Sequence, residues 1–178
     1  MAATQQKSDA SPQSDELVIE RTFDAPRALV WQAWTEPERL ALWWGPRGCT
    51  IRIKKLELRD GGVFHYAMVF SDKNEMWGRF VFRDIAAPER LVFVNSFSDP
   101  EGGVTRAPFP QLRDLWPLEV LTDVGFAEVD GKTRMTLRAR PINATAAERR
   151  AFTGMHASMQ GGYGASFDAL DTLLAKTA

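Results

Sequence analysis

The sequence predicts an α+β domain in which one antiparallel sheet carries its helices on a single face. Three observations indicate this class: about six strand-like segments separated by turns, two short helices after the first strand, and a long amphipathic helix at the end. A chain of 178 residues suits one domain that buries roughly 70% of its unfolded surface. We therefore expect a single domain over residues 16–178, after a disordered Ser/Gln/Asp-rich tail over residues 1–15.

The first elements are a strand and two short helices. Residues 17–23 place apolar side chains on one face and predict a strand. Asp24 can cap the next helix, which we expect from Pro26 to Thr35 because proline suits a first helical turn. A second helix begins at Pro37 and ends at Gly45–Pro46.

The middle of the chain predicts a series of antiparallel strands joined by turns. Asp130–Gly131 is a strong two-residue hairpin signal between two of them. Residues 98–116 form a long segment rich in Pro and Gly, and such a loop is unusual unless it closes a site or floats free. The expected strands are residues 50–58, 63–70, 76–85, 91–97, 117–129 and 132–140.

The last element is predicted to be the longest helix. Thr145 and Glu148 have the spacing of a capping box, in which each side chain satisfies an N–H group of the first turn. Apolar side chains then recur every three or four residues between Phe152 and Leu174, so we expect one helix over residues 145–175.

Three glycines interrupt this helical pattern at positions 161, 162 and 164. Together they cost roughly 2.5–3 kcal/mol of helix stability relative to alanine. One reason is a bend or a close approach of the sheet that shapes a cavity. The alternatives are that packing tolerates them or that the helix breaks there, and the pattern leaves all of these open.

Composition excludes several classes of function. The chain has 22 basic and 23 acidic residues and no basic stripe with interleaved aromatics, which argues against nucleic-acid binding. Cys49 is the single cysteine, so no intramolecular disulfide forms, and this fits a reducing cytoplasm. No apolar run resembles a signal peptide or reaches the roughly 18 residues of a membrane span. The two histidines and one cysteine lack metal-ligand spacing, and no cofactor motif is present, so no metal or cofactor is expected.

Tryptophan is concentrated in the two predicted short helices. Trp31, Trp34, Trp43 and Trp44 fall within fourteen positions. A tryptophan side chain is large and carries one N–H donor, so it favours places where a core meets a cleft. The cluster therefore predicts the lid or wall of a cavity.

Strand alternation predicts which side chains face the last helix. Phe64, Tyr66 and Met68 share one face of their strand, opposite His65. On the next strand the even-numbered positions, Gly78 to Phe82, form the matching apolar row. An ordinary closed core remains the alternative interpretation of these rows.

A series of short sequence motifs follows a specific order and spacing along the chain. They are Arg21 with Phe23, Ala25–Pro26, Val30–Trp31, Trp34–Thr35, Pro37–Glu38, Trp43–Pro46, Gly61–Phe64, Gly78, Pro88–Phe93, Met159, Gly162–Tyr163, Ser166–Phe167 and Leu170. Over residues 17–175 this pattern resembles the START-like, or SRPBCC, superfamily, and within it the branch of heat-shock protein 90 ATPase activator homologues. The resemblance implies a helix-grip fold: a curved antiparallel sheet of about six to seven strands wrapped around a long C-terminal helix, with two short helices after the first strand.

The resemblance implies a cavity between sheet and helix but not one activity. Members of the superfamily serve as lipid carriers, hormone and allergen ligand-binders, polyketide cyclases and co-chaperone domains, and fold does not fix function. The side chains expected to line the cavity and bind a ligand are Trp31, Trp34, Phe64, Tyr66, Met68, Trp77, Phe80, Met155, His156, Met159 and Tyr163. His156 lies within the apolar arc of the helix, where it could hydrogen-bond a ligand or lie at the helix edge with one nitrogen in water.

Three functions are weighed against each other. The leading hypothesis is non-enzymatic binding of a small, largely hydrophobic molecule in the cavity. The second is a cyclase- or hydrolase-type enzyme that uses His156 and Tyr163 as acid–base groups. The third, by analogy with the co-chaperone domain, is interaction with a chaperone partner through an exposed apolar patch. The chain is expected to be a monomer or a weak homodimer.

Overall fold

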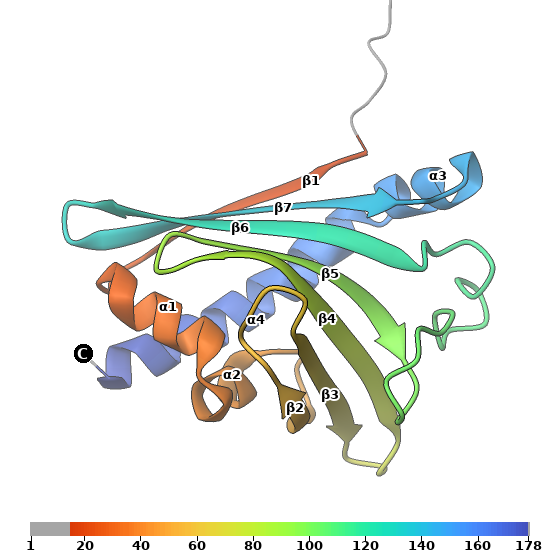
Figure 1. Ribbon diagram of the computed structural model, residues 1–178, viewed down its shortest axis with the longest axis horizontal. Helices are drawn as coiled ribbons and strands as arrows, with labels where there is room; N and C mark the ends of the chain where they lie inside the picture. Colours follow the sequence, from red (N-terminus) through yellow and green to blue (C-terminus); the bar gives the residue numbers. More distant parts are fainter. Residues whose placement is uncertain (1–14, 178) are drawn as a thin grey trace, which may run out of the picture.

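The computed structural model describes residues 15–177 and shows one curved sheet that partly encloses a long helix (Figure 1). Within these residues, seven antiparallel strands lie in the order β1-β7-β6-β5-β4-β3-β2. The strands are β1 (Leu17–Phe23), β2 (Cys49–Leu56), β3 (Val63–Phe70), β4 (Glu75–Ala86), β5 (Arg90–Ser98), β6 (Glu119–Val129) and β7 (Lys132–Ile142). The helices are α1 (Arg27–Thr35), α2 (Pro37–Trp43), α3 (Ala146–Gly154) and α4 (His156–Thr177).

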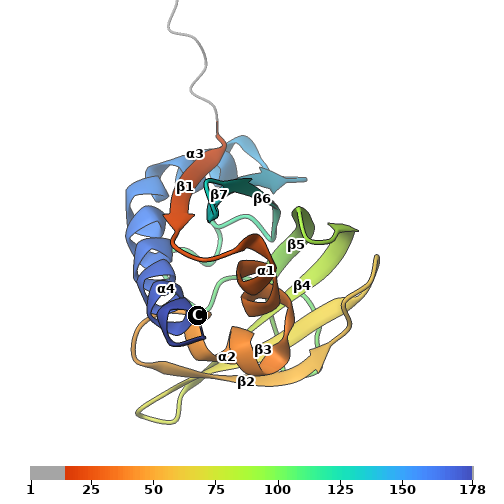
Figure 2. The same cartoon turned by 90° about the vertical axis from the view of Figure 1, so that its left-hand side faces the viewer.

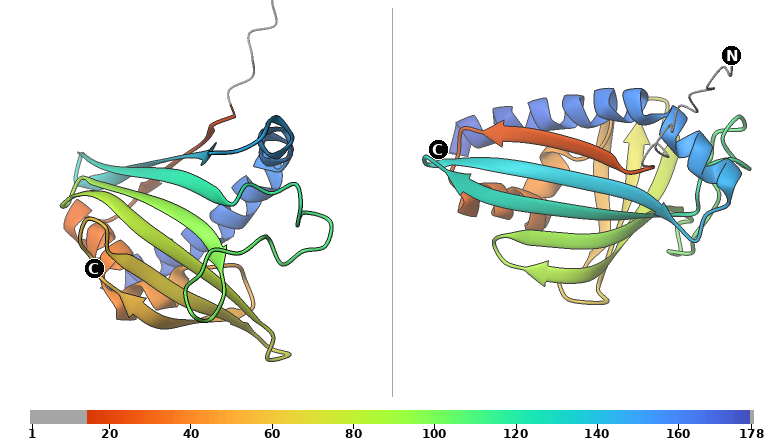
Figure 3. Two further views of the ribbon diagram at one scale, coloured as in Figure 1. Left: turned by 45° about the vertical axis from the view of Figure 1, so that its right-hand side comes forward. Right: turned by 90° about the horizontal axis from the view of Figure 1, so that it is seen from above.

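All helices except α3 pack against the concave face of the sheet. Figure 2 shows α4 along one side of the curve, with α1 and α2 closing one end of the enclosed space. The segment between β5 and β6 lies at the opposite end of the sheet (Figure 3). The α+β helix-grip fold predicted from the sequence is therefore confirmed. No helix of the described part of the chain is both long and apolar enough to cross a bilayer.

Most element boundaries agree with the sequence pattern, and two local predictions were wrong. The Asp130–Gly131 turn has positive φ at both residues, 52° and 76°, as a tight hairpin turn requires. Asp24 does not cap α1, because Pro26 occupies the N-cap position without a side-chain hydrogen bond. The last helix is two helices, since α3 ends at Gly154 and Met155 (φ −96°, ψ 0°) separates it from α4.

The start of α3 has the predicted capping box. The Thr145 hydroxyl accepts a hydrogen bond from the Glu148 N–H at 3.1 Å, and the Glu148 carboxylate accepts from the Thr145 N–H at 2.9 Å. Arg106 donates to the same carboxylate at 2.8 Å, so the β5–β6 segment is tied to α3. Arg106 and the capping bonds hold the pKa of Glu148 below its usual value.

The predicted tail boundary lies at the first described residues. Residues 1–14 lie outside the described residues, so the tail prediction stays a prediction. Asp15 is described, and its carboxylate accepts a hydrogen bond from Arg149 in α3 at 2.6 Å. The ordered domain thus includes the last residue that the sequence pattern assigned to the tail.

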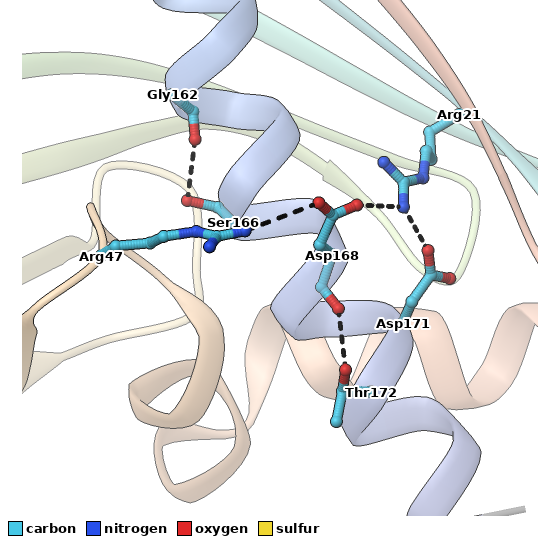
Figure 4. A network of polar contacts seen from close by, with 7 residues as sticks. All are labelled: Arg21, Arg47, Gly162, Ser166, Asp168, Asp171 and Thr172. Atoms are coloured by element: carbon cyan, nitrogen blue, oxygen red, sulfur yellow. Dashed lines mark hydrogen bonds and ion pairs between the residues drawn. The ribbon is translucent and has the colours of Figure 1, made fainter.

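An ion-pair network fixes α4 to the β1 edge of the sheet. Figure 4 shows the Arg21 guanidinium of β1 between Asp168 and Asp171 of α4. The Arg21 Nη2 to Asp168 Oδ1 distance is 2.7 Å, and the second hydrogen bond reaches Asp171. Arg47 approaches Asp168 from the other side at 3.9 Å. One edge of the sheet is therefore closed against the C-terminal half of the helix.

Candidate ligand pocket beneath the last helix

A pocket of about 330 Å³ lies where the N-terminal half of α4 crosses the sheet. None of residues 156–165 is buried, whereas Phe167, Leu170 and Leu174 farther along are at most 3% exposed. Helix α4 packs against β1, α1 and α2 but not closely against β3. The space left between them, which we call the α4 pocket, is lined by Trp44, Gly45, Pro46, Tyr66, Met68, Phe97, Met159, Gly162, Tyr163 and Ser166.

Tyr66 forms the floor of the α4 pocket because of the residue opposite it. Tyr66 pairs with Gly78 across the β3–β4 ladder, and a Cβ atom at position 78 would lie 2.6 Å from the Tyr66 hydroxyl. The phenol thus lies flat over the glycine backbone. It also stacks on Phe64, with ring centroids 4.5 Å apart. Gly78 is therefore required for this orientation of the tyrosine.

The hydroxyl groups of Tyr66 and Tyr163 are held protonated. Burial raises the pKa of Tyr66, and a hydrogen bond with Trp44 offsets part of that rise. Because an indole nitrogen only donates, this contact leaves the Tyr66 hydroxyl its own proton. Burial also raises the pKa of Tyr163 to about 12. Both phenols are neutral hydrogen-bond donors throughout the physiological pH range.

A second hollow of about 200 Å³, the side lobe, adjoins the α4 pocket. The two share Tyr66, Met68 and Phe97 as lining residues. Asn95 lines the side lobe, and its Oδ1 accepts a hydrogen bond from Thr122 at 2.9 Å. The other residues that line the side lobe are Gly78, Ser96, Trp116, Pro117 and Val120.

The segment between β5 and β6 closes the far end of the side lobe. Its last residues, Trp116 and Pro117, form part of the wall. Its first residues fold back on the outer face of the sheet, where Arg79 donates to the Gly102 carbonyl at 2.6 Å. His65 lies under this fold, 4% exposed, with Nε2 3.0 Å from the Asp99 carbonyl oxygen. The segment is therefore packed against the sheet and borders a hollow; whether that hollow is a site remains a prediction.

The mouth of the α4 pocket is formed by a loop and a glycine. The Ser166 hydroxyl donates to the Gly45 carbonyl at 2.9 Å and holds the loop after α2 against the helix. Gly162 lies one turn earlier, and its carbonyl is 3.4 Å from the same hydroxyl. A Cβ atom at position 162 would meet no heavy atom within 4 Å. A side chain there would extend into open space beside the pocket.

Four of the predicted ligand-binding residues line the α4 pocket. They are Tyr66 and Met68 of β3, and Met159 and Tyr163 of α4. Alternation on the strand and periodicity on the helix bring these four to the same space, although ligand binding by them remains a proposal.

Four other predicted residues lie in the packed core or beside it. Phe64 and Phe80 are 0% and 3% exposed and line neither hollow. Trp34 is 3% exposed and packs on Trp43 at a ring distance of 4.8 Å. Trp31 packs edge-on against Phe126 at 5.9 Å. The tryptophan cluster is therefore mainly core. Of its four members, Trp44 alone lines the α4 pocket.

Trp77 lies on the opposite face of the sheet from the pocket, which corrects its predicted position. It pairs with Ala67, so it shares the face of His65, and the two rings are 4.9 Å apart. The cations of Arg52 and Lys54 lie 5.5 and 5.6 Å from its ring. The alternation that turns Phe80 inward turns every odd-numbered side chain of this part of β4 outward.

Met155 and His156 lie at the junction of α3 and α4 rather than in either hollow. The His156 ring contacts Phe152 edge-on at 5.2 Å. Its Nε2 atom is buried and has no hydrogen-bond partner among the described residues. The predicted acid–base groups, His156 and Tyr163, therefore do not meet at the α4 pocket.

The pocket also contains residues that the sequence did not single out. Phe97 follows the inward row of β5, since it pairs with Gly78, and this alternation could have predicted its position. Gly45 and Pro46 were assigned as a helix stop, and they and Ser166 were otherwise named only among the motifs of the family resemblance. Their place at the mouth depends on how α4 crosses the loop, which no local pattern encodes.

Helix α4 runs through the three glycines without a break. A Cβ atom added at position 161, 162 or 164 meets no atom within 4 Å. Close approach of the sheet therefore does not explain these residues. The glycines lie where the helix covers the hollow, and open space surrounds them.

Other hollows on the described residues are less suited to an apolar ligand. One, of about 650 Å³, is a surface groove lined by Asp15, Arg149, Arg150 and small residues of α3. Another of about 350 Å³ lies among arginine and acidic side chains on the outer face of the sheet. No group of three or more His, Cys, Asp or Glu side chains in residues 15–177 is placed to hold a metal ion.

Comparison with known proteins gives a family and a fold. The sequence profile described as "Activator of Hsp90 ATPase homolog 1-like protein" matches residues 24–175. No match was found among curated proteins.

Similar solved structures include proteins from three bacteria. A protein from Arthrobacter aurescens is 26% identical, with 90% of this chain and 86% of that chain covered and a TM-score of 0.73. Protein Ms6760 from Mycobacterium smegmatis is 24% identical, with coverage of 89% and 90% and a TM-score of 0.71. A protein from Rhodobacter sphaeroides is 20% identical, with coverage of 94% and 97% and a TM-score of 0.74.

Proposed function

The chain belongs to the family of activator of Hsp90 ATPase homolog 1-like proteins, and we propose that it binds a small, largely hydrophobic molecule in the α4 pocket. The observation that carries the proposal is a hollow of about 330 Å³ lined mainly by aromatic and methionine side chains. Ligand sites are typically concave, apolar and roughly 300–1,000 Å³ in volume, with a few polar groups that orient the ligand.

Desolvation supplies the main driving force for this binding. Each Å² of apolar surface removed from water contributes about 25 cal/mol. Met68 and Phe97 offer such surface from the sheet, and Met159 offers it from α4. Thioether side chains adapt to irregular ligand shapes because they are unbranched and polarizable. The tyrosine hydroxyls then set the orientation of the bound molecule.

A blocking variant tests the proposal. Gly162→Phe places a ring at the mouth, where the structure has open space, and Gly161→Phe is the matched control because position 161 is exposed and does not line the pocket. Amide chemical shifts are followed while lipids, aromatic compounds and polyketides are added to the full chain. We expect at least one compound to shift residues 159–166 in the parent chain and in Gly161→Phe, and to bind at least tenfold more weakly to Gly162→Phe.

The proposal fails if no compound perturbs these amides selectively. It also fails if Gly162→Phe, still folded by its amide spectrum, binds as tightly as the parent chain, because the ligand would then lie elsewhere.

A chaperone partner is the second candidate function. It is favoured by the family description and by exposed apolar side chains in the β5–β6 segment, Val104, Phe109, Leu115 and Leu118, which are 37–47% exposed. Exposed apolar side chains are candidates for contact with a partner protein when they form a continuous patch. If this candidate is correct, the chain raises the ATPase rate of an Hsp90, and Phe109→Ser with Leu115→Ser removes the effect. An unchanged ATPase rate and no co-purification would exclude it.

A further inference from the structure

The chemistry of the α4 pocket narrows the class of ligand that it takes. This step rests on the proposed function, because it concerns the same pocket. Among the described residues, no Asp, Glu, Arg, Lys or His side chain lines the α4 pocket or the side lobe. A charged group moved from water into such a space loses its hydration without gaining a counter-ion. The lining therefore disfavours carboxylates, phosphates and ammonium groups.

Three polar side chains, Tyr66, Tyr163 and Asn95, can donate hydrogen bonds into the two hollows. Tyr163 has no hydrogen-bond partner among the described residues, so its O–H group is available. Burial keeps the Tyr66 hydroxyl protonated, so it too has a proton to donate. In the side lobe, Asn95 uses its carbonyl oxygen to accept from Thr122, which leaves its amide N–H groups. A bound molecule must offer acceptors to satisfy these donors, because an unmade buried hydrogen bond is costly.

The volume sets the size of the apolar part. An apolar cavity of about 150 Å³ accommodates one benzene molecule. The α4 pocket, at about 330 Å³, therefore holds a body of about two six-membered rings, and the adjoining side lobe leaves room for a substituent.

We infer that the ligand is an uncharged molecule with a body of about two rings and a hydrogen-bond-accepting oxygen placed against Tyr163 and Tyr66. The rings lie between Met68 and Met159, and the oxygen accepts from the Tyr163 hydroxyl. Tyr163 is a specificity-determining residue in this arrangement, because it distinguishes a ketone or ether from a hydrocarbon of the same shape.

Three probes test this inference on the full chain. Benzophenone is a neutral two-ring ketone, diphenylmethane has nearly the same shape without the oxygen, and dodecanoate is a charged chain. Dissociation constants come from amide chemical-shift titrations of the parent chain and of Tyr163→Phe. We expect the preference for benzophenone over diphenylmethane to fall about two- to tenfold in Tyr163→Phe, the loss of one net hydrogen bond. We expect dodecanoate to bind the parent chain at least tenfold more weakly than benzophenone.

The outcomes separate this inference from the proposed function. If Tyr163→Phe leaves the preference unchanged, or if dodecanoate binds most tightly, the ligand class is wrong while an apolar pocket stands. If none of the three probes shifts residues 159–166 while another compound of the wider panel does, the ligand class is wrong and the pocket stands; if no compound of the panel shifts them, both are wrong. The amide spectrum of Tyr163→Phe must remain that of a folded chain, and diphenylmethane binding, which needs no donor, is the internal control for an intact pocket.

Discussion

The two halves of α4 differ in what they cover. In the C-terminal half, Phe167, Leu170 and Leu174 are buried against the tryptophan cluster and β1. In the N-terminal half, no residue from 156 to 165 is fully buried, three of them are glycines, and the α4 pocket lies beneath them. A single helix can thus complete a core at one end and roof a hollow at the other.

The difference follows from the size and anchoring of the side chains. Arg21 and the β1 edge hold the C-terminal half close to the sheet, so that large apolar side chains interdigitate there. The N-terminal half is held by the Ser166–Gly45 hydrogen bond at its boundary, and small residues leave the space unfilled. The fold is stabilised at one end of the helix and remains open at the other.

The largest expected effect is the difference between truncating a large side chain in the C-terminal half of α4 and truncating one in the N-terminal half. Phe167→Ala should lower the free energy of unfolding by about 3–5 kcal/mol, because it opens a cavity in a packed region. Met159→Ala should lower it by less than about 1 kcal/mol, because it only enlarges a hollow already present. Urea denaturation of both variants measures the difference, and equal losses would contradict the contrast between the halves.

The stability of the protein at alkaline pH tests whether the surroundings of the tyrosines at the α4 pocket are apolar. Because burial raises the folded-state pKa values of Tyr66 and Tyr163, the folded chain holds these protons more tightly than the unfolded chain. The stabilisation is complete below pH 10, the ordinary tyrosine pKa, and is lost as the pH rises through about 12. Unfolding free energies at pH 8–12 should decline in the parent chain and decline less in Tyr163→Phe. Identical curves would mean that this phenol is solvated.

Replacing the glycines of α4 by alanine should stabilise the protein. Gly161→Ala and Gly164→Ala should each raise the free energy of unfolding by about 0.8–1 kcal/mol, because the added methyl meets no neighbouring atom and alanine favours helix. Thermal and urea unfolding provide the measurement. A loss of stability in either variant would contradict this expectation, because it would mean that the position needs a glycine despite its regular helical backbone and the open space around it.

The smallest expected effect concerns the ion pairs that anchor α4. Arg21→Ala should cost about 1 kcal/mol or less, because the pairs with Asp168 and Asp171 are partly exposed. Arg47→Ala is the matched control, since its single contact with Asp168 is 3.9 Å long and its side chain is 79% exposed. The Arg21→Ala effect should shrink in 1 M salt. Equal effects of the two variants would argue against anchoring through β1.

Local patterns predicted the α+β class and most of the elements, and the family resemblance predicted the helix-grip arrangement. The geometry of the capping box at Thr145 and of the Asp130–Gly131 turn is determined by a few neighbouring residues, and both have the predicted form. The break at Met155 was missed because the apolar stripe continues across it. Periodicity reports which side chains are apolar, and it does not register a change in helix direction at one residue.

The candidate site was only partly predictable. Alternation and helical spacing place Tyr66, Met68, Met159 and Tyr163 at the pocket. Trp34 was assigned to a cavity wall because tryptophan often borders clefts, but its neighbours Trp43 and Phe126 fill the space around it. The depth of a hollow depends on how far apart two elements are held, and that distance comes from tertiary contacts such as the Arg21 ion pairs.

Xenon binding to crystals of the protein tests most directly whether the hollow exists. Xenon enters apolar cavities without needing a specific hydrogen bond. Anomalous density between Met68, Phe97 and Met159, with none around Phe167, is the result expected for a helix that roofs a hollow at one end and a packed core at the other. An absence of xenon density beneath the N-terminal half, with these side chains in mutual contact, would contradict the account.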